Sequence, residues 1–127
     1  MIDPKAPAAA DFTARPLRLL LRTDGSFQRL EHPVSMRAAH DLIRAEAIDV
    51  VGLRHLGMPL HVMLVDDHGW EYEVVQIGPG HVEHRTTRPR KPINHAATEL
   101  YLANCVPGTT HQIVGDVVIV PDEDYAG

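Results

Sequence analysis

The stretches INHAATELYLANC, from Ile93 to Cys105, and HQIVGDVVIVP, from His111 to Pro121, decide the class of fold. In the first stretch, apolar residues recur at helical spacing, and Asn94 stands before them as a residue type that caps helices. The second stretch is short, apolar and rich in β-branched side chains, which is typical of a strand. The C-terminal third of the chain therefore predicts a helix followed by a strand.

The rest of the chain predicts further strands and one more helix. Asp24-Gly25 separates LRLLLR from QRLEH and indicates a tight hairpin. Ser35 begins a helical pattern in SMRAAHDLIRAEA. Three more strands are expected in IDVVGLRHL, PLHVMLVDD and EYEVVQI, the last two joined as an antiparallel hairpin with Tyr72 packed on the sheet. This order predicts an α+β fold, a mostly antiparallel sheet with two helices packed on one face.

The chain divides into three predicted segments. Residues 1–16 contain three prolines and many small side chains, which predicts a flexible leader. Residues 17–121 are expected to form a single α+β domain. Within that domain, residues 78–92 combine glycine and proline without a clear period, which predicts a long surface loop. Residues 122–127 are interpreted as an acidic tail.

The composition limits the class of protein. A chain of 127 residues with 44% hydrophobic and 23% charged residues is typical of a globular domain. Its net charge of −5 disfavours nonspecific attraction to nucleic acid and to anionic membranes. A single cysteine excludes an internal disulfide. No apolar run reaches the roughly 20 residues of a membrane helix and no signal peptide is evident, so we expect a cytoplasmic protein without a membrane partner.

Cys105, His111 and Asn94 are the residue types of a thiol hydrolase. A nucleophilic cysteine needs a lowered thiol pKa, which a nearby imidazole can supply. Cys105 lies near the expected C-terminal end of a helix, however, where the helix dipole disfavours a thiolate. Cys105 and His111 are therefore catalytic candidates set against a simpler interpretation, in which the three residues are a small buried side chain, a surface histidine and a helix cap.

The sequence contains nine histidines, and the closest pair indicates a candidate metal site. His81, Glu83 and His84 carry metal-binding groups within four positions, but a fourth ligand and a rigid frame are not evident. The alternative is that these residues are ordinary surface side chains. The sequence lacks a phosphate-binding glycine loop, a dinucleotide fingerprint and a nucleophile elbow, so we expect no cofactor.

One stretch of the sequence is strongly basic. HRTTRPRK contains four basic residues within seven positions, and it can pair with phosphates or with an acidic protein surface. No aromatic residue is interleaved, so base stacking on this stretch is not supported. Trp70 lies in an expected turn, where an exposed tryptophan suits a protein interface. The basic binding candidates are Arg85, Arg88, Arg90 and Lys91.

Asn94, Ala97, Thr98, Gly115 and Asp116 form the pattern Asn-x-x-Ala-Thr, then Gly-Asp before an apolar strand. This pattern resembles a family of small proteins of unknown function that is common in phages, plasmids and actinobacterial genomes. The resemblance implies a small soluble accessory protein of a mobile element, and it brings no catalytic residue. The chemistry of these five residues predicts a structural role, in which Asn94 caps the helix, Thr98 continues the polar edge four residues later, and Gly115-Asp116 forms a bend or bulge.

Together these observations favour binding over catalysis. We expect a partner protein in a regulatory or counter-defence setting, contacted by loop 81–91, Trp70 and acidic residues 122–124. The first alternative is a nucleic-acid-associated accessory protein that uses the basic loop, with salt-sensitive binding. The second is a small thiol- or metal-dependent enzyme. An exposed edge strand would also allow a two-fold homodimer.

Overall fold

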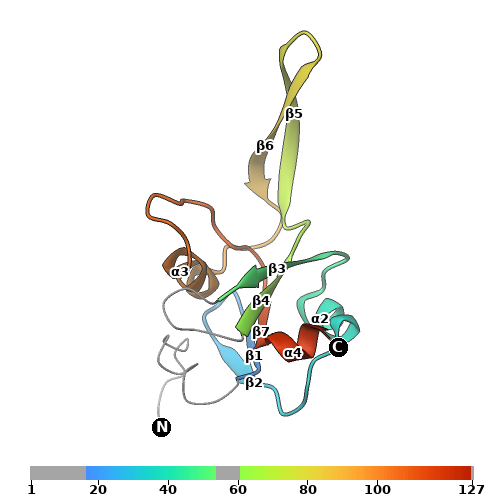
Figure 1. Ribbon diagram of the computed structural model, residues 1–127, viewed down its shortest axis with the longest axis vertical. Helices are drawn as coiled ribbons and strands as arrows, with labels where there is room; N and C mark the ends of the chain where they lie inside the picture. Colours follow the sequence, from blue (N-terminus) through green and yellow to red (C-terminus); the bar gives the residue numbers. More distant parts are fainter. Residues whose placement is uncertain (1–16, 54–60, 127) are drawn as a thin grey trace.

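Strand β7 (Val117–Pro121) lies at the centre of a five-stranded sheet within residues 17–53 and 61–126, which the computed structural model describes (Figure 1). The strand order is β2-β1-β7-β4-β3, and every neighbouring pair is antiparallel. The predicted α+β class and its antiparallel sheet are confirmed. The other strands of this sheet are β1 (Leu19–Leu21), β2 (Phe27–Arg29), β3 (Ile48–Gly52) and β4 (His61–Asp66).

The sheet buries apolar side chains on both faces. On one face, Val117 and Ile119 of β7 pack in a core with helix α3 (His95–Ala103). On the other, Val118 and Val120 pack with helix α2 (Met36–Ile43). The prediction that both helices cover one face is therefore corrected. A run of consecutive apolar residues in a strand points to both sides of a sheet, so each side needs its own cover.

Two local predictions in the N-terminal part of the chain are confirmed. The Asp24-Gly25 turn joins β1 to β2, and Gly25 has a φ of +88°, which suits glycine. Ser35 caps α2, because its hydroxyl accepts a hydrogen bond from the backbone N–H of Ala38 at 3.1 Å. Both features follow from interactions between residues close in sequence.

The predicted hairpin between 59–67 and 71–77 is wrong. Strand β4 pairs with β3 and β7 instead, with Val62 opposite both Gly52 and Val120. All residues of β4 up to Val65 are buried, which suits a position inside the sheet. The next strand, β5 (Trp70–Gly78), has no buried residue and carries two glutamates, which burial inside the sheet would remove from water.

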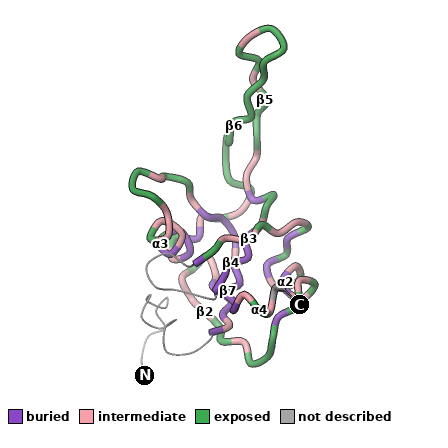
Figure 2. Tube along the Cα trace, viewed as in Figure 1, coloured by how far each residue is buried: buried purple, intermediate pink, exposed green. Residues whose placement is uncertain are grey.

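The predicted loop at 78–92 is also corrected, because it contains strand β6 (His81–Pro89). This strand pairs with β5 as a two-stranded ribbon that projects from the sheet and its helices (Figures 1 and 2). Every residue of β6 is exposed, so neither side of the strand needs apolar side chains. The alternation of apolar and polar residues that marks a half-buried strand is therefore weak in its sequence. Gly80 has a φ of +67° in the connecting turn. Two strands of nine residues make a ribbon about 30 Å long.

The acidic C-terminal segment begins with a short helix, α4 (Asp122–Ala126), that is attached to the sheet. Asp124 accepts two hydrogen bonds from Arg18 at 2.7 and 3.0 Å and a third from the backbone N–H of Val34. These contacts tie Asp124 to the protein itself, against its predicted role in binding a partner. The predicted leader at 1–16 lies outside the described residues. Within residues 17–53 and 61–126, no helix has the length and apolarity to cross a membrane.

Candidate functional site

The β5–β6 ribbon is anchored at its base by backbone and side-chain contacts. The indole Nε1 of Trp70 donates a hydrogen bond to the carbonyl of Gln112 at 3.2 Å. The backbone N–H of Arg90 donates to the carbonyl of Gly69 at 2.8 Å. Trp70 is half-buried at the start of β5 and not in the turn, so it serves the base of the ribbon more than an open interface.

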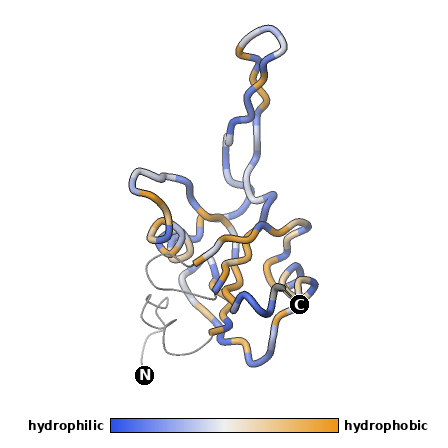
Figure 3. The backbone as a smooth tube through the Cα atoms, in the orientation of Figure 1, coloured by the Kyte–Doolittle hydropathy of each residue, from blue (hydrophilic) through white to orange (hydrophobic). Residues whose placement is uncertain are grey.

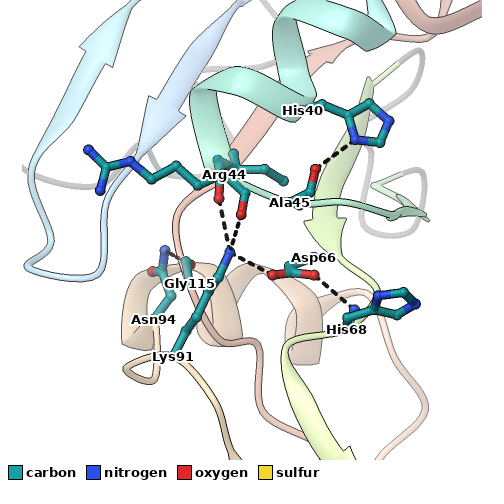
Figure 4. A network of polar contacts seen from close by, with 9 residues as sticks. His40, Arg44, Ala45, Asp66, His68, Lys91, Asn94 and Gly115 are labelled. Carbon is teal, nitrogen blue, oxygen red and sulfur yellow. Dashed lines mark hydrogen bonds and ion pairs between the residues drawn. The ribbon is translucent and has the colours of Figure 1, made fainter.

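Lys91 contacts three oxygen acceptors at this base (Figure 4). Its Nζ lies 3.0 Å from the carbonyls of Ile43 and Arg44, which end helix α2, and 2.6 Å from the Asp66 carboxylate. The Asp66 side chain is only 5% exposed, so this cation neutralises a charge that is almost out of water. Lys91 was predicted to bind a partner, but its partly exposed ammonium group is held by contacts within the chain.

The ribbon has two chemically different faces. Residues opposite each other in an antiparallel pair point to the same side, and successive residues alternate sides. Pairs such as Val74–His84 and Glu73–Arg85 therefore define one face each. What we call the uncharged face consists of Tyr72, Val74, Gln76, Val82, His84 and Thr86. What we call the charged face consists of Glu71, Glu73, Val75, Glu83, Arg85 and Arg88.

The uncharged face places large apolar side chains in water. Tyr72, Val74 and Val82 are 57%, 59% and 54% exposed. Figure 3 shows hydrophobic positions in the outer part of the ribbon, away from both cores. Tyr72 was predicted to pack on the sheet, and that prediction is wrong because β5 leaves the sheet. Exposed aromatic and aliphatic side chains grouped on one surface are typical of binding sites.

On the charged face, the arginines are balanced by glutamates. Arg88 Nε lies 2.6 Å from a carboxylate oxygen of Glu71, and Arg85 lies 3.0 Å from Glu83. A hydrogen bond from Arg88 holds the pKa of Glu71 below its usual range. Residues 70–90 contain three Glu and three Arg, a formal sum of zero. The predicted basic cluster is therefore balanced by acidic side chains: Glu83 lies two residues from Arg85 in the same strand, and strand pairing brings Glu71 beside Arg88.

The candidate metal residues do not converge. His81 and Glu83 share the side of β6 that carries the charged face, and His84 lies on the opposite side. Glu83 is already paired with Arg85. In the described ranges, no three His, Cys, Asp or Glu side chains are grouped so that they could hold a metal ion.

The Cys105 candidates are likewise separated in their contacts. Burial and the neighbouring Cys105 thiol raise the pKa of the Tyr101 phenol. The His111 ring instead lies against aromatic rings, 5.7 Å from Trp70 and 5.9 Å from Tyr101 between centroids. No hydrogen bond joins Cys105 to His111 in the described part of the chain. The arrangement is that of an aromatic cluster beneath the ribbon.

Asn94 belongs to the framework that supports this cluster. Its side-chain oxygen accepts from the N–H of Ala97 at 3.0 Å, and its amide donates to the carbonyls of Leu21 and Gly115 at 3.1 and 3.0 Å. Asn94 is fully buried. Through these hydrogen bonds its side chain joins α3, β1 and the segment before β7. The predicted cap is present, but its two further bonds could not be inferred from local spacing.

The other residues of the Asn-x-x-Ala-Thr and Gly-Asp pattern extend that framework. The Thr98 hydroxyl donates to the Asn94 carbonyl at 2.8 Å and accepts from the N–H of Ile113 at 2.9 Å. Asp116 accepts from the N–H of Thr23 at 3.0 Å. Gly115 has a φ of +77° and would bring an added Cβ within 2.9 Å of Lys91. This pattern therefore joins the body of the protein to the base of the ribbon.

The exposed apolar residues of the ribbon were expected in the sheet or were not among the predicted binding residues. Tyr72, Val74 and Val82 form the exposed apolar surface. The signal that would have revealed them is Gly78-Pro79-Gly80, a turn between two segments of nearly equal length. The geometry defines an α+β protein with a projecting two-faced ribbon.

Comparison with known proteins adds no relative to this description. No family model matches the chain, and no curated protein or solved structure matches it. The resemblance in the C-terminal third therefore stays a prediction.

Proposed function

We propose that this protein is a small binding protein that engages another protein through the uncharged face of the β5–β6 ribbon. The observation that carries the proposal is the exposure of Tyr72, Val74 and Val82 together on one side of a projecting element. An apolar group of this kind is stabilised when a partner removes it from water. The ribbon geometry presents it without displacing the core of the protein.

The stability of the ribbon supports the same proposal. A two-stranded hairpin without a covered apolar face is marginal in water, and three or more strands or a packed face are usually needed. In the described ranges, β5 and β6 pair only with each other, and all of β6 is exposed. A partner that covers the uncharged face would provide the missing layer. The mobile-element setting implied by the C-terminal resemblance, regulatory or counter-defence, remains part of the proposal.

The charge distribution favours a protein partner over nucleic acid. A nucleic-acid surface needs cations that are free to neutralise phosphates. Arg85 and Arg88 are each paired with a glutamate, and Lys91 is held by Asp66 and the end of α2. The uncharged face carries no Glu, Asp, Lys or Arg, so a partner can bind there without breaking an ion pair.

The test is affinity capture from host lysate with the uncharged face altered. Tyr72→Thr, Val74→Thr and Val82→Thr together remove apolar surface but keep residues that favour strands. The matched control is Val106→Thr, because Val106 is 77% exposed and lies outside the ribbon. We expect a stoichiometric protein that is captured by the wild type and the control and lost with the triple variant.

Capture that is unchanged in the triple variant would contradict the proposal. A second variant, with Arg85, Arg88 and Arg90 all changed to Gln, addresses the nucleic-acid alternative. Nucleic acid captured by the wild type, released by raised salt and lost in this second variant would replace the proposed function with that alternative.

A further inference from the structure

Strand β6 has one edge paired with β5 and a second edge without a described partner. Half of the backbone N–H and C=O groups of an outer strand point away from its neighbour, so they are available to another strand. All nine residues of β6 are exposed, and the ribbon stands clear of the sheet and its helices (Figure 1). The open edge is thus reachable by a strand from another molecule.

The regular part of β6 has a middle residue with opposite charges on either side, Glu83 before it and Arg85 after it. Residues 82–86 pair one-to-one with residues 76–72 of β5, and register shifts lie beyond each end of this stretch. His84 is the middle residue. An isologous pairing of two identical strands requires opposed residues to share a face, so its two-fold axis must pass through a residue. Axes through other residues would pair a different set.

The axis through His84 pairs opposite charges. It places Glu83 opposite Arg85 of the second copy, and Arg85 opposite the second copy's Glu83. An axis through Glu83 or through Arg85 would instead oppose two like charges, which destabilises a strand pair. In residues 82–86, the His84 axis is the one that matches both Glu83 and Arg85 with opposite charges.

We propose that β6 pairs antiparallel with β6 of a second copy about His84, giving a four-stranded sheet in the order β5-β6-β6-β5. Strand β5 does not offer the same match, because it carries Glu71 and Glu73 and no cation. The pairing sets the uncharged faces of two ribbons side by side and doubles the surface on which Tyr72 and Val74 lie. The inference rests on the proposed function in that it makes a dimer the form that presents the binding face.

The experiment uses two charge reversals in the full chain, Glu83→Arg and Arg85→Glu. Each variant alone would oppose like charges twice across the axis, and we expect dimerisation weakened by roughly tenfold or more. In an equimolar mixture of the two variants, a heterodimer places the two arginines of one chain opposite the two glutamates of the other. Sedimentation equilibrium over a concentration series, with one variant labelled, measures both the homodimers and the heterodimer.

The mixture separates contacts between chains from contacts within a chain. In each single variant, residues 83 and 85 of the same chain carry like charges, and mixing does not alter that. A heterodimer that forms at least about as tightly as the wild-type homodimer, while each variant alone is weak, supports the pairing. Circular dichroism of each variant alone checks that the fold is retained.

Two results would overturn the inference. A wild-type protein that stays monomeric across the concentration series has no β6 pairing. Variants that dimerise as tightly as the wild type use another surface. Neither result touches the proposed function, which is read from loss of partner capture in the Tyr72, Val74 and Val82 triple variant, and a monomer that still captures its partner would separate the two.

Discussion

Replacing Asn94 by serine separates two roles of one buried side chain. Serine is a good N-cap and can still accept from the N–H of Ala97, so the cap of α3 is kept. Its hydroxyl is too short to replace the amide donor to both Leu21 and Gly115. The variant therefore leaves two carbonyls without the donor that now satisfies them, in a region where Asn94 is fully buried.

The expected cost follows from those two bonds. A buried polar group that loses its partner costs about 1–3 kcal/mol, so two carbonyls predict a loss of about 2–4 kcal/mol after some relaxation. Losing the cap as well, in Asn94→Ala, should add about 1 kcal/mol. Ser35→Ala is the matched control, since it removes the exposed cap of α2 alone and should cost about 1 kcal/mol.

The measurement is urea unfolding followed by circular dichroism, with the free energy of unfolding compared at an unchanged m-value. The expected order of destabilisation is Asn94→Ala, then Asn94→Ser, then Ser35→Ala. If Asn94→Ser costs no more than Ser35→Ala, the two amide donor bonds contribute nothing to stability beyond the helix cap, and the prediction is refuted.

Three further predictions concern stability. Gly115→Ala should cost at least about 2 kcal/mol of unfolding free energy, and Gly25→Ala about 1 kcal/mol. Both glycines have a positive φ, but only an alanine at 115 would also press on the anchored Lys91 side chain. Equal costs in thermal unfolding would refute the contact with Lys91. The hydrogen bond from Arg18 lowers the pKa of Asp124, so the pair contributes stability that is present above the ordinary aspartate pKa of 3.8 and is lost as pH falls through the lowered pKa. Asp124→Asn should therefore flatten the acid limb of the plot of unfolding free energy against pH. An unchanged acid limb would argue against this contribution of the pair. Lys91→Met should cost about 2–3 kcal/mol in urea unfolding, because it leaves the buried Asp66 carboxylate and the end of α2 without their cation. A loss below about 1 kcal/mol would show that these contacts of Lys91 are not stabilising.

Local chemistry was enough to predict several features of the fold. Ser35 and Asn94 cap helices where their sequence neighbours require a cap, and Asp24-Gly25 turns the chain between β1 and β2. Each depends on residues within a few positions, where propensity and geometry act without the rest of the protein. The antiparallel α+β class follows from the number and order of such elements.

The predictions that were wrong concern residues whose partners lie far away in the sequence. The sequence around β4 does not reveal that β7, more than fifty residues later, is its partner. Strand β6 lacks an apolar period because neither of its sides is buried, so the usual signal is missing. Lys91 looked like part of a basic loop because its partners Asp66 and Arg44 lie far away in the sequence.

The separation of the ribbon from the two cores has a consequence for how this protein can change. None of the residues of β5 or β6 belongs to either buried core, and the ribbon is attached through Trp70, Arg90 and Lys91 at its base. Substitutions from Tyr72 to Thr86 should therefore have little effect on the free energy of unfolding of the body, and under the proposed function they should alter partner recognition. If the proposed function holds, the outer ribbon is an exchangeable module, on which partner specificity can diverge while the framework around Asn94 stays the same.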